Sequence, residues 1–117
     1  MPISSVSYRS GDIVVVPFPY TDRLAEKRRP ALVVSGSELL AHGVIWVVMI
    51  TSASNRSWTC DVVIPDLGSA GLTNPSVVRP AKIACIDPGR IVRRSGRLPQ
   101  EAMVRVRGHL TRFQAER

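Results

Sequence analysis

Short runs of β-branched and aliphatic residues, separated by turn-forming residues, constrain the fold of this chain more than any other feature. The three clearest runs cover residues 13–16, 31–35 and 44–50. Runs of roughly four to eight such residues, bounded by glycine, proline or polar stretches, are typical of buried strands. The third run is apolar on both faces, so we expect it to be the central strand of a sheet.

Further strands are predicted in four shorter segments, at residues 59–64, 77–79, 82–86 and 91–93. Pro80 separates two of them, because proline cannot donate a hydrogen bond to a strand ladder. Residues 37–43 predict one or two helical turns, capped by Ser37 and closed by Gly43. The glycine- and proline-containing stretch 65–75 is expected to be a loop.

The C-terminal segment has the periodicity of an amphipathic helix rather than of a strand. Its apolar residues recur at spacings of three and four: Met103, Val106, Leu110 and Phe113. Many short strands followed by one helix, without βαβ alternation, predict a mainly β fold. We expect a small, partly closed antiparallel barrel with this helix packed on it. A chain of 117 residues is expected to form one domain, 1–117, with a short N-terminal extension at 1–10.

The charge balance points to a polyanionic partner. The chain has 16 Lys and Arg against 9 Asp and Glu, a formal net charge of +7. Arginine dominates lysine, which favours bidentate contacts with phosphates and therefore nucleic acid, although a solvated arginine-rich surface has the same composition. The acidic residues form no pair suited to a divalent metal, so no metal and no cofactor are expected.

Two cysteines, Cys60 and Cys85, stand alone in apolar segments, with no second cysteine or histidine at metal-ligand spacing. We expect both to be reduced and buried. The longest apolar run, 44–50, is far shorter than the roughly 20 residues that span a bilayer. No membrane association is expected, and the predicted location is the cytoplasm.

Polar residues flank two of the strongest predicted strands. Arg29 comes immediately before the 31–35 strand, and Thr51 and Ser52 follow the 44–50 strand. If these strands pair antiparallel, the start of one lies beside the end of the other, which places Arg29 and Thr51 on one rim. Such a pair suits RNA scission by the RNA's own 2′-hydroxyl, because the protein then needs only to align the substrate and stabilise charge. An arginine before a rigid strand can equally be a solvated charge.

Several motifs in this order resemble those of the MazF/PemK toxins, close to their PemK-like branch. The matching segments are GDIVVVPFPYTD at 11–22, RPALVVS at 29–35, ITS at 50–52, GL and PSVVR at 71–79, and the closing segment 96–110. The resemblance implies a homodimer of SH3-like barrels that cuts single-stranded RNA without metal. It also implies a small, acidic, partly disordered antitoxin as the cognate partner.

The resemblance also assigns roles to individual residues. Arg29 would bind the scissile phosphate and assist proton transfer, Thr51 would stabilise the transition state, and Ser52 adjoins them. Arg79 matches an arginine that some members use after the later strand. The next positions depart from the family, because Ala81 stands where an acidic residue is common. We expect this change either to slow cleavage or to alter sequence preference.

RNA contacts are expected on both sides of this rim. The candidates are Tyr20, Lys27 and Arg28 in the 18–28 loop, together with Asn55, Arg56 and Lys82. Tyr20 is either a base-stacking platform or a partly buried barrel plug. Trp46 is expected in the core. Trp58 borders a polar loop, where it would suit RNA stacking, a dimer seam or antitoxin docking.

Two other functions use the same composition or fold. A poison of gyrase like the CcdB toxins would share the barrel, but those proteins depend on a C-terminal Trp, and this chain ends FQAER. A non-catalytic, RNA-binding barrel is the second alternative, and the absent carboxylate at Ala81 keeps it open.

Overall fold

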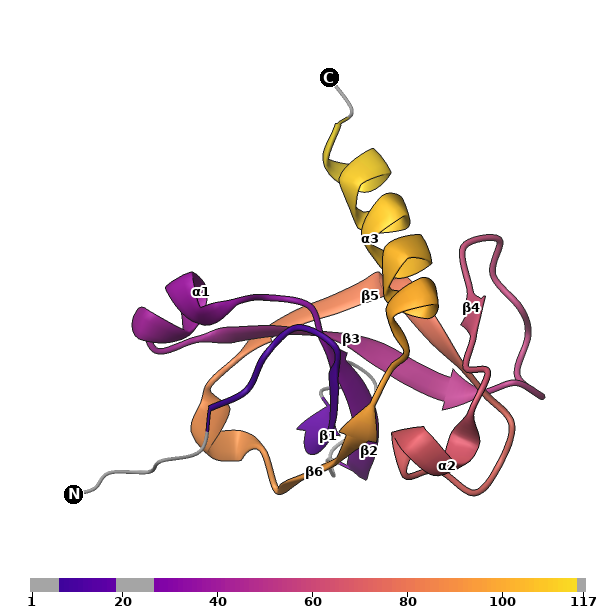
Figure 1. The fold of residues 1–117 in the computed structure, drawn as a ribbon, viewed down its shortest axis with the longest axis horizontal. Coiled ribbons are helices and arrows are strands. Elements are labelled where there is room, and N and C mark those ends of the chain that lie inside the picture. Colours follow the sequence, from indigo (N-terminus) through magenta and orange to yellow (C-terminus); the bar gives the residue numbers. More distant parts are fainter. Residues whose placement is uncertain (1–6, 19–26, 116–117) are drawn as a thin grey trace.

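The computed structural model describes residues 7–18 and 27–115, and its central feature is a six-stranded antiparallel sheet. The strands lie in the order β4-β5-β3-β2-β1-β6, and the sheet curls into a half-barrel (Figure 1). Their bounds are β1 (Asp12–Phe18), β2 (Lys27–Val33), β3 (Ile45–Ser52), β4 (Val62–Val63), β5 (Ser76–Ile86) and β6 (Arg93–Arg97). Together with a C-terminal helix, this sheet confirms the predicted mainly β class.

Both faces of the sheet are covered by apolar side chains, because alternate residues of each strand point to opposite sides. One cluster contains Ile13, Leu32 and Val48 and packs against the C-terminal helix. The other contains Val14, Val33 and Val47, each fully buried. β3 contributes to both clusters and lies between β2 and β5, which confirms the prediction of a central strand.

The helix α3 (Gln100–Gln114) begins after Pro99, its N-cap, and confirms the helix expected from the C-terminal periodicity. Met103 and Val106 are buried against the sheet and Leu110 is half-buried against the same cluster, whereas Phe113 is 46% exposed, so the predicted apolar face reaches the core at every position except the last. Two short helices precede it, α1 (Ser37–Ala41) and α2 (Leu67–Ala70), and η1 (Pro88–Arg90) is a 3-10 turn.

Two local predictions about these helices are wrong. The cap of α1 is Gly36 rather than Ser37, and it makes no side-chain hydrogen bond. The stretch 65–75 is not entirely loop, because Asp66 caps α2 by accepting a hydrogen bond from the Ser69 backbone N–H. This side-chain cap satisfies a helix-terminal donor in a segment whose composition suggests only turns.

β5 is one continuous strand, not the two strands predicted around Pro80. The pairing with β3 runs through Arg79 opposite Met49 and resumes at Ile83 opposite Val48. Residues 80–82 therefore form a bulge. Pro80 has no backbone N–H, and within the bulge no hydrogen bond of the strand ladder requires one. The strands predicted at 59–64 and 91–93 also have different bounds in the structure. β4 covers only two residues, and β6 begins at Arg93.

Three side chains are more exposed than predicted. Trp46 is 39% exposed. It lies on the same face of β3 as the buried Val48, but nearer the start of the strand, where it lines an open pocket and not the core. Its cross-strand neighbour Cys85 is exposed as well, and Cys60 is half-buried. Both thiols are free, but the prediction that they are buried is wrong. No described helix is long and apolar enough to span a membrane.

Candidate functional site

The pairing of β2 with β3 brings Arg29 and Thr51 to the same end of the sheet. The two strands are antiparallel, with Ala31 opposite Met49 and Leu32 opposite Val48. Two residues further along this register, Arg29 stands level with Thr51. Both residues line one groove of about 240 Å³, together with Ser52. The rim expected from strand direction is therefore present.

The far wall of this groove comes from the loop between α2 and β5. Leu72, Thr73 and Asn74 line it, and Ser76 follows at the start of β5. Sequence reasoning did not assign these residues to the site, although Leu72 and Ser76 lie within the motif segments at 71–79. They reach the groove because β5 pairs with the end of β3, where Ser52 lies opposite Ser76.

Thr51 is 7% exposed, and its hydroxyl is held by a neighbouring amide. The side-chain amide of Asn55 donates a hydrogen bond of 2.7 Å to Thr51 Oγ1. The backbone N–H of Asn55 donates to the Ser52 carbonyl at 3.1 Å, which closes a tight turn after β3. Since Thr51 Oγ1 accepts from Asn55, its own proton remains available for donation into the groove.

Ser52 is exposed beside Thr51. Its hydroxyl lies 2.8 Å from the Ser54 hydroxyl and accepts a hydrogen bond from the Ser54 backbone N–H at 3.2 Å. The Ser52 hydroxyl is therefore already hydrogen-bonded to Ser54 in the turn after β3. For this reason Thr51 is the better candidate for the hydroxyl that contacts a ligand.

Arg79 does not line the Arg29–Thr51 groove but anchors the loop that follows Asn55. Its guanidinium donates two hydrogen bonds of 2.9 Å to the two carboxylate oxygens of Asp61 and one of 2.8 Å to the Arg56 carbonyl. Asp61 also accepts from the Trp58 backbone N–H at 2.9 Å. One buried arginine thereby holds the loop at three points.

The Arg79–Asp61 pair dominates the electrostatics of this loop. Both side chains are 8% exposed. The hydrogen bonds from Arg79 lower the pKa of the Asp61 carboxyl, and burial opposes this effect only in part. The same contacts raise the pKa of Arg79. The sequence contained no signal for this pair, since Asp61 and Arg79 lie 18 residues apart.

The remaining predicted contact residues divide into two groups. Arg56 and Lys82 are exposed near Trp58, and the Lys82 ammonium is 5.6 Å from the Trp58 ring centroid. Arg28 is exposed on β2, and the Lys27 backbone pairs with that of Phe18 at the end of β1. Tyr20 lies outside the described residues.

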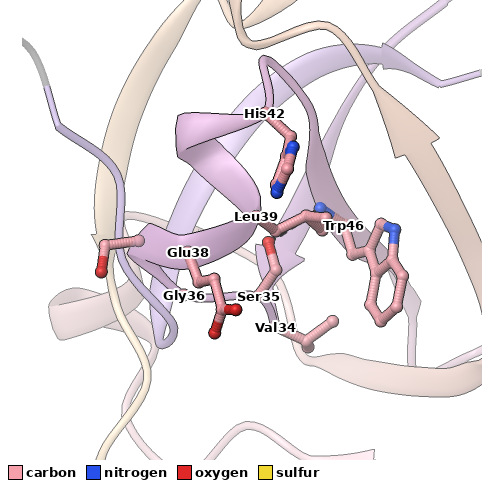
Figure 2. Close-up of a pocket in the computed structure, with 8 residues that line it drawn as sticks. Val34, Ser35, Gly36, Glu38, Leu39, His42 and Trp46 are labelled. Carbon is pink, nitrogen blue, oxygen red and sulfur yellow. Dashed lines mark hydrogen bonds between the residues drawn. The ribbon is translucent and has the colours of Figure 1, made fainter.

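A larger pocket, about 590 Å³, lies at the opposite end of β3 beside α1. Figure 2 shows Glu38, His42 and Trp46 around it. Within residues 7–18 and 27–115, no lysine or arginine lines this pocket, and Glu38 repels phosphate, so the chemistry of this lining does not suit a polyanion. Among the residues that the structure describes, no group of three or more His, Cys, Asp and Glu side chains could hold a metal ion.

This half-barrel with one terminal helix is the fold of the MazF toxins. A chain of the MazE-MazF complex from Deinococcus radiodurans is 22% identical, with a TM-score of 0.73 over 97% of this chain and 100% of that one. The Mycobacterium tuberculosis toxin MazF-mt6 is 21% identical, with a TM-score of 0.70 over 91% and 99%. A mycobacterial endoribonuclease in complex with its cognate antitoxin is 18% identical, with a TM-score of 0.73 over 95% and 99%.

The family itself is shown by the sequence match. The model of PemK-like, MazF-like toxins of type II toxin–antitoxin systems matches residues 9–113, which is nearly the whole chain. The protein therefore belongs to this toxin family, as its motifs indicate. No curated protein sequence matches the chain.

Proposed function

We propose that this toxin is a metal-independent endoribonuclease that cleaves single-stranded messenger RNA. The observation that carries the proposal is the groove in which the Arg29 side chain and the Asn55-held hydroxyl of Thr51 meet. A guanidinium and a neutral hydroxyl donor suit a phosphodiester, because both can donate to its oxygens and neither adds negative charge. Membership of the toxin family supports the same activity.

The reaction uses the substrate's own nucleophile. The ribose 2′-hydroxyl gives its proton to water and attacks the adjacent phosphorus, and the bond from phosphorus to the 5′-oxygen breaks. The leaving 5′-oxygen takes a proton from water, so the products are a 2′,3′-cyclic phosphate and a 5′-hydroxyl. Arg29 neutralises charge on the phosphorane, and the Thr51 hydroxyl donates a hydrogen bond to a non-bridging oxygen. Arg29 stays protonated at neutral pH, so its contribution is mainly electrostatic.

The biological partners follow from the family and the charge. The structural neighbours include a MazE-MazF complex and an endoribonuclease with its cognate antitoxin. We expect this chain likewise to bind a small, acidic, partly disordered antitoxin, which complements a net charge of +7. A homodimer acting in the cytoplasm is the expected functional form.

The direct test is cleavage of a long single-stranded RNA in excess EDTA. Wild-type protein should cut at a recurring short sequence, and Thr51→Ala should lower the rate about 100-fold or more, because an oriented donor to the phosphorane is lost. Thr111→Ala, which removes an exposed threonine hydroxyl from α3, is the matched control and should cut like wild type.

Two results would contradict the proposal. A folded protein that binds RNA without cutting it would be a non-catalytic barrel. A protein that neither cuts nor binds RNA but inhibits gyrase would be a poison of the CcdB kind. Circular dichroism of each variant separates loss of activity from loss of fold.

A further inference from the structure

Trp58 occupies an unusual position between a buried cation and solvent. Its indole ring is 39% exposed, and the guanidinium carbon of Arg79 lies 4.5 Å from the ring centroid. Arg79 itself is only 7% exposed, so it lies on the protein side of the ring. The cation–π contact fixes the position of a large aromatic ring that is partly exposed to solvent. Such a ring can serve as a binding surface for a ligand.

The Trp58 ring is also held in a defined place. Its backbone N–H donates to Asp61, and the Asp61 N–H donates back to the Trp58 carbonyl at 3.0 Å. Arg79 binds both Asp61 and the Arg56 carbonyl, so the loop on either side of Trp58 is tied to β5. Such preorganisation reduces the entropy that a ligand would lose by ordering the loop.

The surroundings of Trp58 are cationic. Arg56 and Lys82 are exposed, and Asp61 is already neutralised by Arg79. Arg56 and Trp58 line a pocket of about 440 Å³ with Ser57, Thr59 and Cys60. An aromatic ring beside exposed cations is the combination that binds single-stranded nucleic acid, since bases stack on the ring and phosphates contact the cations.

The loop that lines this pocket begins at the Arg29–Thr51 groove, because Asn55, which contacts Thr51, directly precedes Arg56. Arg79 pairs with Met49 and Val77 with Thr51, so alternation along β3 and β5 places Arg79 on the same face as Thr51, two residues away. The loop that carries Trp58 also carries Asn55, which contacts Thr51. A single RNA strand in the groove would therefore pass from one site to the other.

From these observations we propose that Trp58, seated on Arg79, is a base-stacking subsite for a nucleotide that flanks the scissile phosphate. Lys82 and Arg56 would contact the neighbouring phosphates. The inference rests on the proposed ribonuclease function and adds a residue that determines affinity. Charge favours RNA over an apolar protein segment, because Arg56 lines the pocket and Lys82 lies beside the Trp58 ring.

Tryptophan fluorescence tests this proposal directly, since Trp46 and Trp58 are the only tryptophans. Trp46→Phe leaves Trp58 as the sole reporter. Its emission should be quenched by a random-sequence single-stranded RNA of about ten nucleotides in which every 2′-hydroxyl is methylated, so that no cleavage occurs. Trp58→Phe, which leaves only Trp46 at the far end of β3, should show no quenching.

Affinity for the same RNA, labelled and followed by anisotropy, is the second measurement. Trp58→Leu keeps an apolar cover over Arg79 but lacks a stacking face, and should weaken binding about tenfold. Trp58→Phe should restore most of the affinity, a rescue that a merely structural role would not require.

The outcomes separate this inference from the function on which it rests. RNA that binds and is cut, with Trp58 emission unchanged and Trp58→Leu binding like wild type, would overturn the subsite and leave the nuclease intact. Quenching by an acidic antitoxin but not by RNA would assign the surface to protein docking. Absence of both binding and cleavage in wild type would overturn the proposed function as well.

Discussion

Asn55 provides the sharpest test of how the groove works, because its amide controls the direction of one proton. Asn55 Nδ2 donates to Thr51 Oγ1 at 2.7 Å, which leaves the Thr51 proton free to point at a substrate. Asn55→Asp preserves size and shape but replaces the donor with an acceptor. The Thr51 proton would then turn toward the new carboxylate, away from the phosphate.

The expected magnitudes follow from this geometry. Losing one oriented donor to a developing oxyanion costs about 3–4 kcal/mol, so Asn55→Asp should slow cleavage by roughly 100- to 1,000-fold. Asn55→Ala removes only the bond that orients Thr51, a contribution of about 1 kcal/mol, and should slow cleavage about fivefold. The isosteric substitution should therefore be much more harmful than the truncation.

Single-turnover cleavage of a labelled RNA in EDTA measures these rates. Asn74→Asp is the matched control for charge, because Asn74 lines the same groove and is exposed. A carboxylate there should cost no more than about 1 kcal/mol through repulsion of the phosphate in water. If Asn55→Asp is no slower than Asn55→Ala, or no slower than Asn74→Asp, the proposed role of the Thr51 proton is wrong.

Three further predictions concern the stability of the scaffold. Asp61→Ala leaves Arg79 buried without its partner and should lower the free energy of unfolding in urea by about 3–5 kcal/mol; a loss below about 1 kcal/mol would contradict the anchor. Because Arg79 lowers the pKa of Asp61 in the folded state, this pair stabilises the fold above about pH 4, and its contribution should fade as the pH drops through the lower folded pKa. An acid-unfolding curve of Asp61→Asn should lack that component. Gly71→Ala should destabilise by roughly 2–4 kcal/mol, since Gly71 has φ +74° and an added Cβ would lie 2.1 Å from the Ser95 carbonyl oxygen. Gly36→Ala has no neighbour within 4 Å and loses only the preference for glycine at the N-cap of α1, so it should cost less than about 1 kcal/mol in the same assay.

Local sequence patterns predict the buried strands of this fold but not the bulge at Pro80 or the exposure of Trp46. Strand candidates such as 13–16 and 44–50 were recognisable because apolar, β-branched runs reflect burial on a sheet. The bulge at Pro80 was not, because proline marks a missing donor without showing whether the chain turns away or continues. Trp46 was misassigned to the core because strand periodicity gives the face of a residue, not how far along that face the covering layer extends.

The mainly β class, the C-terminal helix, the basic charge and the toxin family could all be predicted from the sequence, because they depend on residue types and on their order. The sequence also suggested that Arg29 and Thr51 meet, since antiparallel strands reverse direction. Three contacts became visible only in the folded chain: Asn55 with Thr51, Asp61 with Arg79, and Trp58 with the same arginine. These contacts depend on hydrogen-bond register and loop closure between distant segments, which no local spacing encodes.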